Sequence, residues 1–220
     1  MNLEDISELD TAKPLQISKT PSSFDRSIEP EFGKTPVIPT PDVKTAQLKN
    51  GLEVFSLYSD EVPLVEIKLT IDGALLLESP DKNGTANLVA NMLTRGTATK
   101  SAEELNNKIR QLGSTITVAA EREKIVLKAS ALARNYETAM ALIGEILTQP
   151  RWDLTEFELA KQTVTGQLQQ SSADPEAIAK QQLYRLVYPK HHPLANNTLG
   201  TEESISKITI DDLIPISLIK

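Results

Sequence analysis

The segment from Gly84 to Thr97 constrains the fold more than any other part of this chain. At helical spacing its large apolar side chains form one stripe, and such a stripe must pack against a core to leave water. Three shorter side chains gather on a second face through three- and four-residue spacing. The stripe consists of Leu88, Val89, Met92 and Leu93, and the second face of Asn87, Ala90 and Asn91. The sequence therefore predicts a core helix whose second face is the place for chemistry.

Strand signals lie on both sides of this helix. Asn50-Gly51 stands between two apolar runs and predicts a tight hairpin, because glycine supplies the positive φ of such a turn. Residues 65–71 alternate apolar and polar side chains with period two, which indicates a half-buried strand that ends at Gly73. Residues 115–120 and 125–131 predict two further strands. We expect the charged turn between them, 121–124, to be solvated surface.

Helical spacing dominates the second half of the chain. Ser101 and Glu104 form a capping box that opens a helix, and Gly113 is its expected stop. Gly166 lies inside a later helix, where it costs about 1 kcal/mol relative to alanine. We read this glycine as a sign of close packing against another backbone, with the 84–97 helix as the neighbour. The other expected helices begin at Tyr136, at Thr155 as N-cap, at Pro175, at Thr201 and at Thr209.

This order of elements predicts an α+β fold with a mixed or antiparallel β-sheet and helices packed on one face. An apolar content of 40% in 220 residues is enough for one substantial core. Residues 1–44 hold six of the thirteen prolines and few apolar residues, so we expect a proline-rich arm or inter-domain linker there and a domain over 45–220. The alternative for the arm is an extended strap. Its anchors would be Phe24, Phe32, Val37 and Ile38.

Charge and composition exclude several classes of function. A formal net charge of −7 with scattered basic residues argues against nucleic-acid binding and against an anionic-membrane patch. Without cysteine there is no disulfide framework and no thiolate chemistry. No apolar run approaches the roughly 20 residues of a membrane-spanning helix, and residues 1–20 lack a secretory signal. We expect a soluble protein, and both the cytoplasm and the periplasm or cell envelope stay open as its compartment.

The residues around the core helix resemble the insulinase, pitrilysin and mitochondrial processing peptidase family of zinc metallopeptidases. The matching positions are Gly73, Glu78, Gly84, Met92, Leu93, Gly96 and Thr97. Active members carry the inverted zinc motif His-x-x-Glu-His at this helix and a third ligand, a glutamate, on a later helix. Under the resemblance the two histidines fall on Asn87 and Asn91, the glutamate base on Ala90, and the third ligand on Gln167, within the segment 161–175.

The residues at all three ligand positions and at the base position of that motif are therefore replaced in this sequence. Neutral amide oxygens are weak zinc donors beside imidazole or carboxylate, and a methyl group cannot carry a proton. We expect no catalytic residue, no metal ligand and no cofactor in this chain. His191 and His192 are its only histidines, and adjacent side chains do not both face one metal from a regular element. An ordered or exposed loop histidine is the expectation for both.

The resemblance implies a catalytically inactive half or subunit of a clamshell zinc peptidase. Such a half contributes chamber wall, partner interface and peptide binding, while the zinc site lies in a homologous subunit or fused half that cuts the peptide. Edge-strand addition of the peptide beside the core helix is the implied binding mode in the catalytic half. A purely structural subunit, like the core proteins of respiratory complexes, is the alternative, and hydrolysis by this chain with an unusual metal is a third reading. The resemblance also implies that a further strand would follow residue 220 to complete the sheet.

Overall fold

The computed structural model describes residue 25, residues 27–29, residues 33–37 and residues 40–214, and the chain divides into two compact units at Tyr58 and Ser59. In the first unit, strands β1 (Val43–Gln47) and β2 (Glu53–Leu57) form an antiparallel hairpin in which Ala46 lies opposite Val54. Gly51 has a φ of 86° at its tip, which confirms the predicted hairpin and the role of its glycine. The domain boundary predicted at residue 44 or 45 stays a prediction.

The second unit is built on a three-stranded antiparallel sheet with the order β3-β5-β4. Strand β3 (Leu64–Asp72) pairs with β5 (Lys124–Leu132), and β5 pairs on its other side with β4 (Thr115–Ala120). The predicted period of two is confirmed on β3: Ile67, Leu69 and Ile71 face the core, while the residues between them are exposed. One face of the sheet is therefore apolar and one is polar, as expected for an α+β domain.

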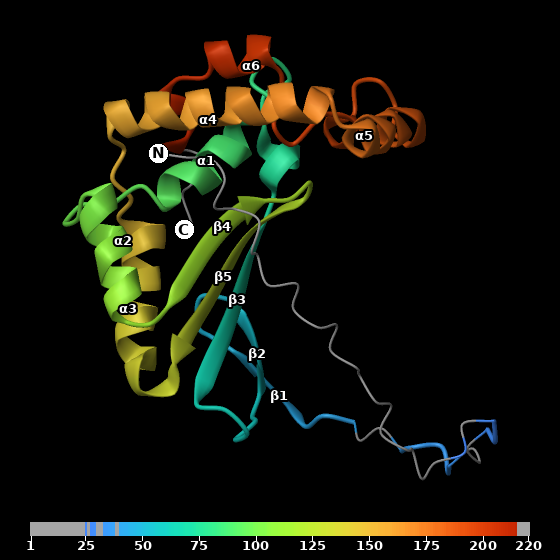
Figure 1. The fold of residues 1–220 in the computed structure, drawn as a ribbon. Helices are drawn as coiled ribbons and strands as arrows, with labels where there is room; N and C mark the ends of the chain where they lie inside the picture. The colour runs from blue at the N-terminus through green and yellow to red at the C-terminus, as the bar shows by residue number, and fades with distance from the viewer. Residues whose placement is uncertain (1–24, 26, 30–32, 38–39, 215–220) are drawn as a thin grey trace, which may run out of the picture. The chain divides into compact units, whose positions relative to one another are not determined.

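Helices cover the apolar face of this sheet (Figure 1). The described helices of this unit are α1 (Thr85–Leu93), α2 (Ala102–Gln111), α3 (Tyr136–Thr148), α4 (Leu154–Ser172), α5 (Pro175–Val187) and α6 (Glu202–Lys207). Short 3-10 turns lie at Ala74–Leu77, Ala133–Asn135, Pro193–Ala195 and Ile210–Asp212. Helix α1 packs against both β4 and α4, so it is sandwiched between the sheet and an outer helix. No helix in the described part of the chain is long and apolar enough to cross a membrane.

Local sequence signals set most helix ends. Ser101 and Glu104 form the predicted capping box, and Gly113 follows α2 with a φ of 59°. One N-cap prediction was wrong: α4 begins with Asp153, not Thr155, as its cap. The Asp153 carboxylate accepts the backbone N–H groups of residues 155 and 156. This cap is stronger than a threonine hydroxyl, because its negative charge also interacts favourably with the positive end of the helix dipole. Residues 215–220, which would lead into the further strand that the resemblance implies, lie outside the described residues.

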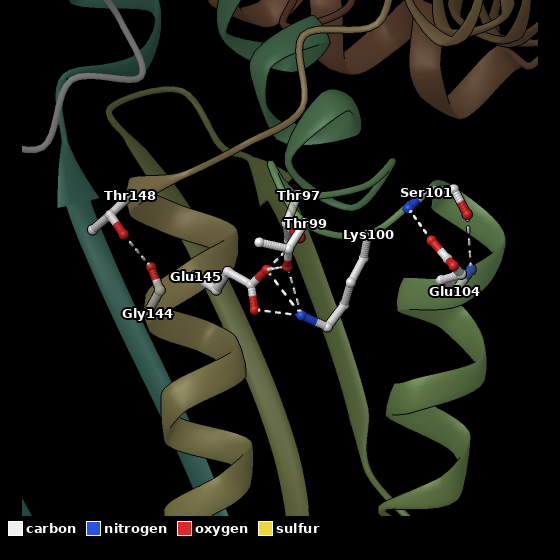
Figure 2. Close-up of polar contacts among 8 residues, drawn as sticks. All are labelled: Thr97, Thr99, Lys100, Ser101, Glu104, Gly144, Glu145 and Thr148. Atoms are coloured by element: carbon white, nitrogen blue, oxygen red, sulfur yellow. Dashed lines mark hydrogen bonds and ion pairs between the residues drawn. The ribbon is translucent and has the colours of Figure 1, made fainter.

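The turn after α1 is fixed to α3 by a polar cluster around Glu145 (Figure 2). The Lys100 ammonium lies 2.7 Å from one carboxylate oxygen, and the Thr97 and Thr99 hydroxyl groups donate to the other. These three donors, Lys100 first, lower the pKa of Glu145 to about 2. Gly96 begins this turn with a φ of 113°, and an added Cβ there would lie 2.8 Å from the carbonyl oxygen of Lys100. The exit of α1 is thereby fixed in position.

Candidate functional site

The N-terminus of α1 has no side-chain cap of its own and is satisfied by Glu78 instead. One carboxylate oxygen of Glu78 accepts the N–H of Ala86 at 2.8 Å, and the other accepts the N–H of Gly84 at 3.0 Å. Burial raises the pKa of Glu78, and these hydrogen bonds offset part of that rise. Gly84 has a φ of 97° and an added Cβ would lie 2.8 Å from the carbonyl oxygen of Leu199, so no other residue fits there. The sequence identified Glu78 and Gly84 as family positions. It did not show that the carboxylate of Glu78 caps the helix that begins at Gly84.

The face of α1 that carries the predicted motif positions is occupied by amides and a methyl group. Ala90 is 1% exposed and belongs to the core. Asn91 donates its side-chain amide to the backbone carbonyl of Asn87 at 2.9 Å, so it is used within the helix. The amide nitrogen of Asn87 is buried and has no hydrogen-bond partner among the described residues. Asn87 and Asn91 therefore lie one turn apart, as predicted, whereas Ala90, which was predicted to share their face, is buried in the core.

The fourth motif position, Gln167, lies on the neighbouring helix. Helix α4 buries Phe157, Ala160 and Val164, and it packs against α1 as expected. Gln167 itself is exposed, and no hydrogen bond in the described part of the chain joins it to Asn87 or Asn91. The interpretation of Gly166 was wrong, because no atom lies within 4 Å of the place a Cβ would take. The glycine is therefore not required for close backbone packing, and the buried side chains of α4 lie in the same core as those of α1.

These residues do not fit a zinc ion. Zinc sites in proteins use imidazole, thiolate or carboxylate donors, and the four positions offer two asparagine amides, a methyl group and a glutamine amide. The side-chain nitrogen of Asn91 donates to its own helix, so only its neutral amide oxygen is left as a donor, and that is a weak zinc ligand. Among the described residues, no group of three or more His, Cys, Asp or Glu side chains is placed to hold a metal.

Sequence reasoning missed the role of Arg122, which was expected to be solvated. It is half-buried at the β4–β5 turn, and its guanidinium donates to the carbonyl oxygens of Leu194 and Asn196 at 2.7 Å each. It also donates to the Gln181 side chain and lies 3.3 Å from the ring centroid of Tyr184. This single side chain joins the sheet, α5 and the loop after α5. The signal was the spacing of Gln181, Tyr184 and Tyr188, which places all three on one helix face.

The two histidines lie in the loop that Arg122 holds. His192 stacks on Tyr188 with ring centroids 5.1 Å apart, and its Nδ1 accepts the backbone N–H of Leu194 at 3.2 Å. His191 is exposed. A hollow of about 1060 Å³ opens beside this stack, between the β4–β5 turn, the end of α4, α5 and the loop 194–202. Asn87, Ala90, Asn91 and Gln167 do not line it. The structure thus separates the predicted motif face from this hollow.

Comparison with known proteins places the sequence beside one peptidase family. The family model described as insulinase, peptidase family M16, matches residues 53–202. The mitochondrial-processing peptidase subunit beta of Neurospora crassa is 26% identical over 171 residues, which are 78% of this chain and 36% of that protein. An uncharacterized zinc protease of Rickettsia bellii is 25% identical over 76% of this chain and 40% of its own length. The chain therefore spans well under half the length of these curated relatives.

Solved structures confirm the fold. The crystal structure of a peptidase M16 inactive domain from Pseudomonas fluorescens superposes with a TM-score of 0.73 at 22% identity, covering 79% of this chain and 42% of that one. A protease from Helicobacter pylori also gives a TM-score of 0.73, at 18% identity, with coverage of 80% and 43%. At this level of identity the agreement is one of architecture. It confirms the α+β domain with antiparallel strands and helices on one face.

Proposed function

Because this chain belongs to the insulinase family of M16 peptidases, we propose that it is a non-catalytic half or subunit of a two-half zinc peptidase. It contributes chamber wall, partner interface and peptide binding, and a homologous half supplies the zinc and the base. One observation supports the proposal: α1 packs against α4, and the positions that the family resemblance assigns to the zinc motif hold Asn87, Ala90, Asn91 and Gln167. A helix scaffold kept without its donors supports a role in shape and binding.

The sheet supports the peptide-binding part of this proposal. In the order β3-β5-β4, strand β4 is an edge among the described strands, and α1 packs directly beside it. An edge strand offers unpaired N–H and C=O groups to an extended peptide, which then adds as one more strand. An enclosed chamber built from two such halves excludes water and holds the peptide near the catalytic centre. This half would hold peptide without cutting it.

Reconstitution with a zinc-bearing homologue that has an intact His-x-x-Glu-His motif tests the function. The homologue is assayed for cleavage of an unstructured peptide, alone and with this chain at increasing molar ratio. We expect a stable complex and a rise in the cleavage rate that saturates at a fixed stoichiometry. The substitution Val118→Pro on β4 removes one edge N–H group, and it should lower peptide affinity while the complex still forms. Lys68→Ala, on the exposed face of β3, is the matched control.

Two other outcomes would count against the proposed function. A complex that forms without any change in cleavage or peptide affinity would favour the structural-subunit alternative over this proposal. Cleavage by this chain alone, lost on Asn87→Ala or Gln167→Ala and accompanied by tightly bound zinc, would contradict the non-catalytic assignment directly.

A further inference from the structure

His192 holds the loop after α5 through an atom that must carry no proton. Its Nδ1 accepts the backbone N–H of Leu194 at 3.2 Å, and this bond caps the short turn Pro193–Ala195. Because a backbone N–H only donates, Nδ1 has to present its lone pair. Leu194 is 5% exposed, and its N–H has no other acceptor among the described residues, so water is a poor replacement for the imidazole.

The same kind of turn occurs elsewhere in the chain with a different acceptor. In those turns a side-chain oxygen accepts the backbone N–H two residues later, and it belongs to Asp25, Asn50, Asp153, Asp174 or Asn197. An amide does not titrate, and a carboxylate remains an acceptor at neutral pH. Imidazole is the acceptor whose charge changes between about pH 5 and 8. Of these turns, the one at His192 is therefore the turn that can lose its acceptor near neutral pH.

The turn at His192 is connected to α5 through one stack of rings. The imidazole stacks on Tyr188 with centroids 5.1 Å apart, and Tyr188 stacks on Tyr184 at 6.3 Å. The guanidinium of Arg122 lies 3.3 Å from the Tyr184 ring centroid. It also donates to the carbonyl oxygen of Leu194, the residue whose N–H the imidazole accepts. No residue of α5 is buried, so a change in this turn acts on a helix that has no core packing of its own.

We propose that His192 is a pH-sensitive switch: protonation of its imidazole opens the turn Pro193–Ala195 and loosens α5, while the sheet and the core helices stay folded. A proton on Nδ1 sets a donor against the N–H donor of Leu194, so the capping bond is lost. The proton also adds positive charge to a stack that already contains the guanidinium of Arg122. This switch is independent of the proposed peptidase role.

The charged groups around the loop do not compensate for the added proton. The carboxylates that line the hollow beside the stack are Glu121, Glu123 and Glu202, and Glu78 follows the turn Ala74–Leu77, which packs on the turn at His192. The cations are Arg122, Lys124, Lys180 and Arg185, with Lys190 and His191 in the loop itself. In the described part of the chain, none of these carboxylates forms an ion pair or hydrogen bond with His192. The unfolded chain therefore takes up this proton more readily, and the attachment of α5 weakens as the pH falls.

Amide hydrogen exchange of the whole chain tests the switch. The measured quantity is the protection factor, which removes the intrinsic pH dependence of exchange, at about pH 7.5 and about pH 5.5. In the parent we expect the protection of residues 176–198 to fall by about fivefold at the lower pH, as for one lost hydrogen bond. The protection of α2 and α3 should not change, because neither helix contacts the turn.

Two substitutions at His192 separate the acceptor from the proton. His192→Asn keeps an acceptor oxygen at both pH values, as Asn197 does for the N–H of Leu199, so its protection should be the same at both. His192→Leu has no acceptor and should show the lower protection at both. Each variant removes the stacking ring, so the difference between them reports the hydrogen bond. His191→Asn, at the exposed neighbouring histidine, is the matched control and should respond to pH as the parent does.

Other ionisable groups are common to all of these variants. Burial raises the pKa of Glu78, for example, and any effect of that carboxyl group cancels in the comparison between variants. A parent chain whose protection in α5 is the same at both pH values would overturn the proposal. So would a His192→Asn variant that responds like the parent, or a His192→Leu variant that keeps high protection throughout. A melting curve at the higher pH verifies that each variant is folded.

Discussion

At the scale of single residues, Glu145 makes the stability of the fold depend on pH in the acid range. Its carboxylate accepts hydrogen bonds from the Lys100 ammonium and from two threonine hydroxyl groups, and its pKa of about 2 lies below the ordinary value of 4.5. A carboxyl group with a lowered pKa in the folded state stabilises the fold fully above its unfolded pKa. That contribution is lost as the pH falls from 4.5 toward about 2. Glu145 therefore ties the α1–α2 turn to α3 at neutral pH and releases it in acid.

We predict that Glu145→Gln lowers the free energy of unfolding by about 1–2 kcal/mol at about pH 6, an amount reduced by the partial solvent exposure of the cluster. The difference from the parent should shrink steadily as the pH is lowered toward about 3. Urea denaturation followed by circular dichroism across this range measures both. Glu137→Gln, on the exposed side of α3, is the control and should show a small difference. A Glu145→Gln effect independent of pH would contradict the pKa assignment.

At the scale of elements, α5 depends on Arg122. The guanidinium satisfies two carbonyl oxygens of the following loop and lies against Tyr184, and the helix buries no side chain of its own. The planar guanidinium of arginine has several N–H donors in a fixed arrangement that suits these contacts. The ammonium group of a lysine does not have this arrangement. Arg122, on a different element, is therefore a main attachment of α5, beside the hydrogen bond from Gln181 to the carbonyl oxygen of Ala195.

We predict that Arg122→Ala destabilises the domain by about 2 kcal/mol, because two partly buried carbonyl groups lose their donor and the contact with Tyr184 is lost. Amide hydrogen exchange should accelerate in α5 and the loop 189–198 more than in α2 or α3. Arg122→Lys should recover less than half of the loss. Arg134→Ala, at an exposed position, is the control and should stay within about 0.5 kcal/mol. Unchanged exchange in α5 would show that other contacts hold it.

The packing of α1 against α4 gives a second prediction at this scale. We predict that the triple variant Asn87→His, Asn91→His and Gln167→Glu binds one zinc ion per chain, since it restores three donors on two helices that pack together. Ala90 is left unchanged, because a glutamate at this buried position would bring a charge into the core. Titration calorimetry measures the affinity. The double histidine variant is the control and should bind at least about tenfold more weakly. Equal binding by both would show that α4 does not present residue 167 to α1.

At the scale of the whole molecule, no metal contributes to folding if the proposed function is correct. We predict that an excess of chelator changes the melting temperature by less than about 1 °C. A folded state that binds no metal gains no stability from metal binding, so the chelator has none to remove. Differential scanning fluorimetry, on protein expressed in medium with added zinc, measures the melting temperature with and without chelator. The triple histidine and glutamate variant is the positive control, and chelation should lower its melting temperature. A clear fall in the parent would reveal a metal that supports the fold.

Much of the fold was predictable from the sequence because its causes are local. The alternation on β3, the capping box of Ser101 and Glu104, the glycine of the hairpin and the proline that opens α5 each act within a few residues. The residue types at Asn87, Ala90, Asn91 and Gln167 are also readable from the chain, and their assignment to the zinc motif stays a prediction. Its consequence for function stays a proposal.

Tertiary structure decided what depends on long-range neighbours. Nothing within a few residues of Arg122 shows that it meets carbonyl groups of residues 194 and 196, and nothing near Gly166 shows that its surroundings are open. Likewise, the apolar spacing of α5 is that of a core helix, yet its stripe faces outward. The physical reason is that periodicity tells which side chains share a face, whereas the direction of that face is fixed by elements far away in the chain.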